Sequence, residues 1–354
     1  MIKFAKIIIM QIIDNSHRAV EHFLIPKMTY QFLHRPRRLR TNPIIRSLVE
    51  ENYLKASDFV LPVFISEEEN PTEVPSMPGV FRWPISNLCE QIKDWHQRGL
   101  KAFALFPKIS PELKNEGGSE ILNPNSLVCR AAAAIKQLGL DVVLIADLAL
   151  DPYTTHGQDG IVDSNGEVVN DSTVEILAKA SIVYANAGLD WVAPSDMMDG
   201  RVKIIREALE RNSFHNTGII SYSAKFSSSY YGPFRSAIGS SMDSVIIDKS
   251  TYQLNPANLL EAKRELALDA EEGADILMVK PAEPFLDIIK QARSQSNLPI
   301  AAYQVSGEYS RIMAANQLGW LDWKSCALES LVGIKRAGAN IIFSYFADRL
   351  AKDL

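Results

Sequence analysis

The chain has 354 residues, of which 47% are hydrophobic and 22% charged, and its formal net charge is −5. This composition is typical of a globular protein with material for one large core or two smaller ones. The acidic balance excludes a broad basic face for nucleic acid, and no apolar run approaches the roughly 20 residues of a membrane-spanning helix. The three cysteines, Cys89, Cys129 and Cys326, lie far apart and suggest no disulfide framework. We therefore expect a reducing, cytoplasmic location without nucleic-acid or membrane partners.

The first 50 residues differ in character from the rest. The apolar run Ile7–Ile13 imitates a signal peptide, but it is short and no small-residue cleavage site follows it. Met28 opens a more conventional N-terminus, so residues 1–28 are expected to be an extension outside the fold. Residues 29–50 are expected to form an N-terminal arm. Within it, the composition of Tyr30–Arg46, with five arginines and two prolines, favours a solvated basic loop over a contact with a neighbouring subunit.

Short apolar, β-branched runs recur along the remaining chain, and each has the pattern of a strand that is buried on both faces. They are Phe59–Ile65, Ala102–Pro107, Val142–Ala146, Trp191–Pro194, Gly218–Tyr222, Ile276–Val279, Ile300–Val305 and Ile341–Phe346. Most of them are separated by segments with the apolar spacing of a helix. These segments are Leu88–Arg98, Ser126–Leu138, Ser172–Ala187, Gly200–Arg211, Ala257–Glu272, Pro284–Ser294 and Lys324–Ala337.

Eight strands that alternate with helices over residues 51–354 predict an α/β fold, a TIM (β/α)8 barrel with the arm extending from it. Glycines suited to a left-handed cap end several of the helices, as at Gly99 and Gly139, and the next strand follows within a few residues. The alternative is a doubly wound open sheet. The strand count, together with the lack of a GxGxxG turn after the first strand, favours the barrel.

Polar residues stand at the expected carboxyl ends of the strands, where barrel enzymes carry their chemistry. They are Asp147, Ser195, Asp196, Lys225, Lys280, Tyr303, Ser306 and Tyr345. Two of the loops that follow, Asp147–Asp171 and Phe226–Asn255, are unusually long. Loops of this length in a compact domain are usually lids or binding loops.

Lys225 and Lys280 end neighbouring apolar strands. One such lysine would usually mark a strand end and reach solvent. Two ammonium groups in one cavity raise the cost of charging each other, so at least one amine is expected to be neutral near pH 7. A neutral lysine amine can form a Schiff base with a ketone. The pair therefore indicates a site for carbonyl substrates, with room for two of them.

The two long loops carry further candidates, each with a structural alternative. Phe226, Tyr230, Tyr231 and Phe234 can exclude water from the site. In the same loop, Arg235 and Lys249 either clamp a substrate carboxylate or are solvated charges. The other loop contains Asp147, Asp151, His156 and Asp159. These are either turn residues or proton carriers and ligands for a hard cation such as Mg²⁺, and no thiolate is present there for a tetrahedral zinc site.

Four motifs carry a family resemblance: Ser-Tyr-Ser-Ala-Lys225-Phe with Tyr-Gly-Pro-Phe-Arg235, Met-Val-Lys280-Pro, Ala-Pro-Ser-Asp196-Met-Met-Asp-Gly, and Tyr303-Gln-Val-Ser306-Gly-Glu-Tyr. From about Arg35 to the C-terminus the chain resembles the porphobilinogen synthases, or 5-aminolevulinate dehydratases. The resemblance implies a TIM barrel that condenses two molecules of 5-aminolevulinate to porphobilinogen. Two waters are lost in this step of tetrapyrrole (haem) biosynthesis.

The resemblance also implies roles for individual residues. Lys280 would form the Schiff base with the first substrate, and Lys225 would bind the second ketone. The implied carboxylate ligands are Arg235, Lys249 and Gln253 for one substrate and Ser306 with Tyr345 for the other, under a lid formed by Phe226–Asn255. Tyr231, Phe234 and Tyr303 complete the substrate-binding set, and Asp147, Asp151 and Asp159 join the lysines as catalytic residues.

The metal and the assembly are likewise implied by the resemblance. Zinc-dependent relatives place three cysteines where this chain has Ala149, Asp151 and Asp159. Thiolates select zinc and carboxylates suit harder ions, so the chain resembles the aspartate-type, zinc-independent subgroup, and no catalytic zinc is expected. That subgroup implies an allosteric Mg²⁺ on Glu265 and a homo-octamer whose arms wrap neighbouring subunits. By spacing alone, Glu261, Glu265 and Asp269 would instead form a solvated helix face.

Two other functions stay open at this point. A class I aldolase would also use a Schiff-base lysine, but it needs only one. A catalytically silent barrel could bind a ligand or serve assembly. The retention of both lysines with their polar neighbours argues against each of these alternatives.

Overall fold

The computed structural model describes residues 32–240 and 248–354, and the chain forms two compact units, residues 1–51 and 52–354. The expected extension, residues 1–28, lies outside the described residues. In the smaller unit, a 3-10 helix, η1 (Pro36–Arg40), precedes the short helix α2 (Pro43–Leu48). The Asn42 side chain caps α2 by accepting a hydrogen bond from the backbone N–H of Ile45 at 2.9 Å. Two parts of the segment expected to be a loop, residues 36–40 and 43–46, are therefore helical, and no residue of these two helices is buried.

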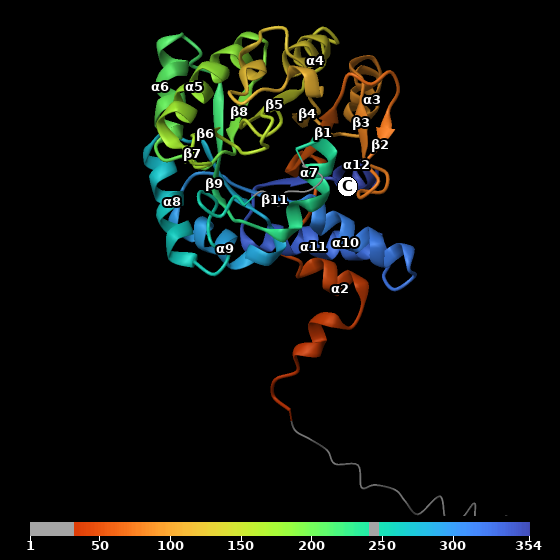
Figure 1. Ribbon diagram of the computed structural model, residues 1–354. Helices are drawn as coiled ribbons and strands as arrows, with labels where there is room; N and C mark the ends of the chain where they lie inside the picture. The colour runs from red at the N-terminus through yellow and green to blue at the C-terminus, as the bar shows by residue number, and fades with distance from the viewer. Residues whose placement is uncertain (1–31, 241–247) are drawn as a thin grey trace, which may run out of the picture. The chain divides into compact units, whose positions relative to one another are not determined.

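Eight parallel strands form a closed barrel in the larger unit (Figure 1). They are β1 (Phe59–Ile65), β4 (Ala102–Pro107), β5 (Val143–Leu148), β8 (Trp191–Pro194), β9 (Gly218–Lys225), β10 (Ile276–Lys280), β11 (Ile300–Gln304) and β12 (Ile341–Ser344). Each strand pairs with the next, and β12 closes the barrel on β1 with Ile342 opposite Phe59. The predicted TIM barrel is confirmed, since an open sheet would leave its two edge strands unpaired.

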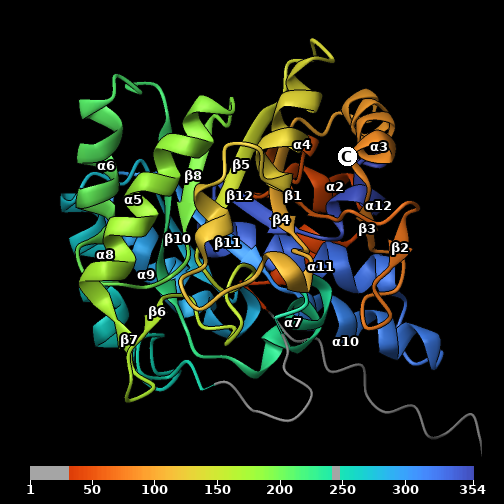
Figure 2. The same cartoon turned by 45° about the horizontal axis from the view of Figure 1, so that its top comes forward.

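Helices surround the strands, as Figures 1 and 2 show for α5, α6, α8 and α9. The main helices are α3 (Ile85–Gln97), α4 (Leu127–Lys136), α5 (Asn170–Asn186), α6 (Arg201–Arg211), α8 (Leu259–Glu271), α9 (Leu286–Gln295), α10 (Ser306–Gln317) and α11 (Trp323–Ala337). All of them were expected except α10. Its first turn contains Gly307, and polar residues interrupt the apolar spacing. Within the described part of the chain, no helix combines the length and apolar character that crossing a bilayer requires.

Smaller elements fill the connections of the barrel. They are the strands β2 (Thr72–Glu73), β3 (Phe81–Trp83), β6 (Ile161–Val162) and β7 (Val168–Val169), the helices α7 (Gly232–Ile238) and α12 (Ala347–Leu350), and the 3-10 turns η2 (Ala56–Asp58), η3 (Pro111–Leu113), η4 (Ser119–Leu122), η5 (Ser229–Tyr231) and η6 (Glu283–Phe285). The β6–β7 hairpin belongs to the long loop after β5. Both η5 and α7 belong to the predicted lid, of which residues 241–247 lie outside the described residues.

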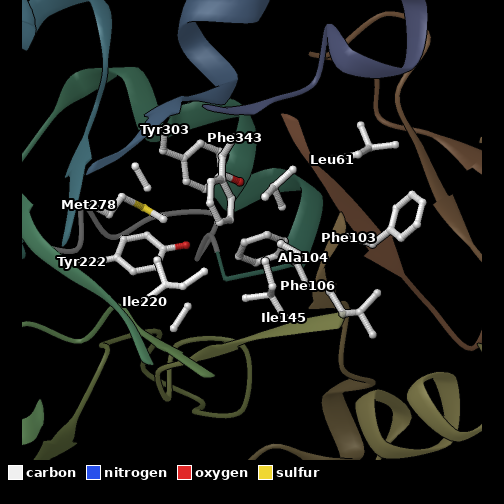
Figure 3. Close-up of a cluster of buried hydrophobic side chains, with 14 of the residues drawn as sticks. Leu61, Phe103, Ala104, Phe106, Ile145, Ile220, Tyr222, Met278, Tyr303 and Phe343 are labelled. Atoms are coloured by element: carbon white, nitrogen blue, oxygen red, sulfur yellow. The ribbon is translucent and has the colours of Figure 1, made fainter. Parts of the chain in front are cut away.

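Aromatic side chains fill the interior of the barrel (Figure 3). The Tyr303 ring centroid lies 5.4 Å from that of Phe343, 6.3 Å from Phe106 and 6.4 Å from Tyr222. Tilted aromatic pairs of this kind contribute about 0.5–1.5 kcal/mol each beyond the area they bury. The barrel is thus a packed core rather than a pore. The polar side chains that could take part in a reaction therefore lie at the ends of its strands.

Candidate active site

Lys225 and Lys280 are the last residues of β9 and β10, and they stand opposite each other in the register of the two strands. Both side chains are buried. Their amines lie on the same ring, with Nζ of Lys280 4.8 Å and Nζ of Lys225 6.0 Å from the Tyr222 centroid. The structure thus brings the two predicted lysine amines together beside one aromatic ring.

Aromatic rings surround the Lys280 amine. Its Nζ lies 4.5 Å from the Tyr303 centroid, 5.2 Å from Phe234 and 5.3 Å from Tyr231. Among the residues that the structure describes, no carboxylate forms an ion pair with it. Burial, followed by the charge of Lys225, lowers the pKa of Lys280 to about 7. Much of this amine is therefore uncharged, and nucleophilic, at neutral pH.

Lys225 has an ionic environment instead. Its Nζ lies 3.0 Å from Oδ2 of Asp159, and it donates a hydrogen bond to the carbonyl of Ser195. The other oxygen of Asp159 lies 2.6 Å from Nζ of Lys249. Burial opposes ionisation of Asp159, but the two ammonium groups hold its pKa well below the ordinary value. The two neighbouring lysines therefore differ in their surroundings. A carboxylate forms an ion pair with Lys225, and no described carboxylate does so with Lys280.

The end of the predicted lid supplies the remaining polar groups on the Lys225 side. Lys249 is buried and also lies 3.5 Å from Oδ2 of Asp151. Gln253 donates a hydrogen bond from Nε2 to Asp159 at 3.3 Å, while its Oε1 has no partner among the described residues. Burial raises the pKa of Asp151, against the effect of Lys249. This region holds more charge than the aromatic surroundings of Lys280.

Asp147 stands near the end of β5 and is the other predicted carboxylate. Its Oδ2 accepts a hydrogen bond from the Ser195 hydroxyl at 3.0 Å, and within the described residues its buried Oδ1 has no partner. Burial raises the pKa of Asp147 to about 6, and the charge of Lys280 works in the opposite direction. A carboxyl group with this pKa can both accept and donate a proton near neutral pH.

Tyr222 belongs to the site but was not predicted from the sequence. Side chains alternate along a regular strand, which would place Tyr222 and Lys225 on opposite faces. In the structure, Ser221 pairs with Leu277 and Ala224 with Val279, so β9 advances three residues where β10 advances two. This bulge brings Lys225 to the same face as Tyr222. The motif that contains both residues gives no sign of the bulge.

The start of the lid lies against the first turn of α10. Ser306 Oγ accepts a hydrogen bond from the backbone N–H of Phe234 at 3.0 Å and donates one to the Tyr230 carbonyl at 3.3 Å. A Cβ on Gly307 would lie 2.5 Å from that same carbonyl oxygen, so only glycine allows this approach. Beside them, the hydroxyl of Tyr345 lies 3.1 Å from that of Tyr303.

The predicted substrate-binding residues therefore fall into two groups. Tyr303, Tyr231 and Phe234 surround Lys280, and behind them Tyr345 bonds Tyr303 and Ser306 bonds the backbone of Phe234. Lys249 and Gln253 lie beside Asp159, which pairs with Lys225. Arg235 lies half-buried in α7, and no described carboxylate forms an ion pair with it. His156 is held by the turn: its Nδ1 accepts from the N–H of Gln158 and its Nε2 lies 3.1 Å from the Glu116 carbonyl. This favours the structural alternative for His156.

Comparison with known proteins decides the family. Residues 33–353 match the model of the delta-aminolevulinic acid dehydratase family. The chain belongs to that family. It is a hydro-lyase with the porphobilinogen synthase activity of the family, in which aminolevulinate is condensed to porphobilinogen. The aldolase and the catalytically silent barrel are thereby set aside.

Individual members of the family cover nearly the whole chain. The dehydratase of Chlamydia pneumoniae is 49% identical over 314 residues, which is 88% of this chain and 94% of the relative. The chloroplastic dehydratase of Oryza sativa is 47% identical, covering 90% of this chain and 75% of its own. The solved structure of the Toxoplasma gondii dehydratase in complex with porphobilinogen matches with a TM-score of 0.89 and 46% identity, over 92% of each chain.

The predicted metal ligand of this family member, Glu265, lies on α8. It lines a cavity of about 940 Å³ together with Glu261 and Asp199. Burial raises the pKa of Glu265, and the charge of Asp269 adds to the effect. Within the described residues, no group of three or more His, Cys, Asp and Glu side chains is arranged to hold a metal ion by itself.

The prediction that Asp269 lies on a solvated helix face is wrong. Its carboxylate is buried 3.3 Å from the Arg201 guanidinium and accepts a hydrogen bond from the Ser221 hydroxyl at 2.6 Å. Arg201 is itself buried and also bonds the carbonyls of Met198 and Tyr222. The i,i+4 spacing could not reveal this, because the partner of Asp269 comes from a distant helix.

Proposed function

We propose that Lys280 forms the Schiff base with the first 5-aminolevulinate and that Lys225 binds the ketone of the second. The supporting observation is that these neighbouring lysines have opposite surroundings, aromatic for one and ionic for the other. The neutral amine of Lys280 attacks the ketone carbon, and the resulting carbinolamine loses water to give the imine. The strand register, in which Lys225 and Lys280 are partners, supports a position for the second ketone beside the first.

The polar residues divide the remaining tasks. Asp147, with a pKa near 6, is placed to carry protons to and from the bound substrates. Ser306 and Tyr345 bind the carboxylate of the first substrate, and Arg235, Lys249 and Gln253 bind that of the second. Asp151 and Asp159 hold the lysines of the second-substrate side. Closure of the lid then excludes water from the imine.

Trapping with borohydride tests this assignment in the unmodified enzyme. We expect incubation with 5-aminolevulinate and borohydride to give a reduced adduct on the peptide that contains Lys280, detected by mass spectrometry. A second adduct, on Lys225, is expected as the substrate concentration rises. If neither lysine is modified while the enzyme turns over, the assignment is wrong.

The lowered pKa of Lys280 predicts how activity depends on pH. Only the neutral amine attacks a ketone, and its fraction falls about tenfold for each pH unit below the pKa. We therefore expect kcat/KM and the rate of adduct formation at Lys280 to rise with pH and to level off above about 7. The trapping rate, measured by mass spectrometry, separates this group from carboxylates that titrate nearby. A midpoint near 10.5, the ordinary lysine value, would contradict the proposed environment.

We propose further that the chain belongs to the zinc-independent subgroup and carries an allosteric Mg²⁺. The loop after β5 presents Ala149, Asp151 and Asp159, and the ammonium of Lys249 lies between the two carboxylates. Because this ammonium already pairs with both carboxylates, no zinc ion is needed between them. Glu265 fits Mg²⁺, because this ion keeps most of its water and needs one or two carboxylates and a roomy site. When bound, the ion would offset the repulsion among the acidic side chains around it.

Removal of each metal in turn distinguishes a requirement for zinc from a requirement for Mg²⁺. A strong zinc chelator is expected to leave activity unchanged, whereas removal of Mg²⁺ is expected to lower it. Glu265→Ala should abolish the rise in melting temperature that Mg²⁺ gives the wild type, since a ligand that binds only the folded state stabilises it. Glu271→Ala, an exposed position on the same helix, is the matched control and should keep the Mg²⁺ effect. Activity lost to zinc chelation and restored by zinc alone would overturn the subgroup assignment.

The assembly is proposed to be the homo-octamer implied by the family resemblance. The arm supports this, since its apolar side chains Leu33, Ile44 and Leu48 are 82%, 73% and 78% exposed. Apolar side chains presented in this way suit a contact with another subunit. Light scattering tests the proposal, because a monomeric mass at working concentration is incompatible with it.

A cytoplasmic location remains a prediction. All three cysteines are free, as a reducing compartment requires. Some relatives are described as chloroplastic, such as that of Oryza sativa, and the chlamydial one is not. Fractionation of the source cells, with an antibody against the chain, is the direct measurement.

A further inference from the structure

We propose that Tyr252 and Gln158 position Lys249 and Gln253 against Asp159 and so determine how tightly the second substrate binds. The hydrogen-bonded pair is called the Tyr252–Gln158 clasp below. This inference rests on the proposed function, in which Lys249 and Gln253 bind the second carboxylate. It adds two positioning residues, neither of which has a role in that scheme.

The clasp joins the loop after β5 to the end of the lid. The hydroxyl of Tyr252 donates a hydrogen bond to Oε1 of Gln158 at 2.6 Å. The same hydroxyl oxygen accepts a hydrogen bond from the backbone N–H of Asp159 at 3.3 Å. Gln158 in turn donates from Nε2 to the carbonyl of Asp248 at 3.1 Å. Three hydrogen bonds thus connect segments that lie about 90 residues apart in the chain.

Tyr252 lies on the same turn as the two residues it is proposed to position. The carbonyl of Lys249 accepts hydrogen bonds from the N–H of Tyr252 at 3.3 Å and of Gln253 at 2.9 Å. On its other side the turn is fixed to β9, since the N–H of Leu254 donates to the carbonyl of Lys225 at 3.0 Å. The turn is therefore held at two places, at Lys225 by the backbone and at Asp159 by the Tyr252 hydroxyl.

The clasp acts from outside the reacting groups. Tyr252 and Gln158 are partly exposed and line the cavity of about 940 Å³ that also contains Glu265. Neither side chain contacts either of the two active-site lysines through any hydrogen bond or ion pair in the described residues. Loss of the hydroxyl therefore removes no group that meets substrate. It releases the turn that carries Lys249 and Gln253, and the predicted consequence is weaker binding rather than slower chemistry.

The test is Tyr252→Phe in the full chain, which keeps the ring and removes only the hydroxyl. We expect KM for 5-aminolevulinate to rise about five- to tenfold while kcat changes less than about twofold. At a fixed, subsaturating substrate concentration, the borohydride-trapped adduct on Lys225 should fall by a similar factor. The adduct on Lys280 should stay at the wild-type level, because the first substrate does not use the clasp.

Gln158→Ala removes the other half of the clasp and should reproduce the rise in KM. The double variant should be no worse than either single variant, since residues that act as one unit are not additive. Tyr184→Phe is the control: it loses a hydroxyl bonded to the Tyr153 hydroxyl at 2.7 Å, which among the described residues has no hydrogen bond to Asp159 or to the clasp, and it should keep the wild-type KM. If Tyr252→Phe does not fold, Gln158→Ala carries the test alone.

Three results would overturn the inference: a KM within twofold of wild type in both single variants, an equal loss of the Lys225 and Lys280 adducts, or multiplicative effects in the double variant. Each differs from a failure of the proposed function. That failure would be seen in the wild type itself, as turnover without any adduct on Lys280.

Discussion

Lys280→Ala is expected to abolish turnover, lowering kcat by a factor of about 10⁴ or more, as the loss of a covalent nucleophile does in other enzymes. Alanine leaves the aromatic surroundings in place but removes the amine that is proposed to form the imine. Its neighbour Lys225 is not expected to substitute for it, because that amine is engaged in an ion pair with Asp159 at 3.0 Å. The measurement is product formation together with trapped adducts. In the variant, the adduct at this position must be absent.

Lys290→Ala is the matched control for this variant. Lys290 lies on α9 and is exposed, so its loss should change neither kcat nor the adduct on Lys280. Near-wild-type turnover in Lys280→Ala would refute the assignment of the Schiff-base lysine. A folded variant is expected, because Lys280 forms no ion pair among the described residues and its removal deprives no described carboxylate of a partner.

Asp159→Ala is expected to have the second large effect, on both stability and activity. The carboxylate is buried and holds Lys225 on one oxygen and Lys249 on the other. Removing one member of a buried ionic group leaves the remaining charge uncompensated, which typically costs about 3–5 kcal/mol. Asp151 can still serve Lys249, so the loss of stability should lie at the lower end of that range. Urea denaturation measures the free energy of unfolding.

In the same variant, kcat/KM is expected to fall about 100-fold, since the second-substrate side loses its organisation. Asp171→Ala is the control for the loss of a carboxylate in the same loop. Asp171 is exposed in the first turn of α5, and its loss should affect neither quantity strongly. An Asp159→Ala protein that kept wild-type kinetics would show that this carboxylate is not needed at the site.

The barrel could be predicted because its strands are apolar on both faces. The run Ala102–Pro107 was expected with the bounds that β4 has in the structure, and Trp191–Pro194 with those of β8. Such strands have little variation in burial, so composition alone identifies them. The position of Lys280 followed from the same pattern, because the run Ile276–Val279 stops directly before it. By contrast, the run Gly218–Tyr222 was expected to be shorter than β9, which extends to Lys225. The prediction that two amines share a cavity depended only on the lysine that follows each run.

What could not be predicted depends on contacts between distant parts of the chain. The bulge in β9 is defined by its pairing with β10, so alternation along β9 could not reveal that Tyr222 and Lys225 share a face. The burial of Asp269 depends on Arg201, from another helix. The bond between Ser306 and the lid backbone depends on how α10 and the lid meet. In each case the local sequence is compatible with either outcome, and tertiary packing decides.

The pairing of Lys225 with Lys280 across β9 and β10 has a consequence for how the enzyme aligns its two substrates. Adjacent strands lie about 4.8 Å apart, a spacing that backbone hydrogen bonds impose whatever the side chains are. The proposed anchoring points of the two substrates are thus separated by a constant of β-structure, and loops are free to diverge without disturbing it. A slip of one residue between these strands would send one amine to the opposite side of the barrel wall. The reaction would then fail even with every side chain present.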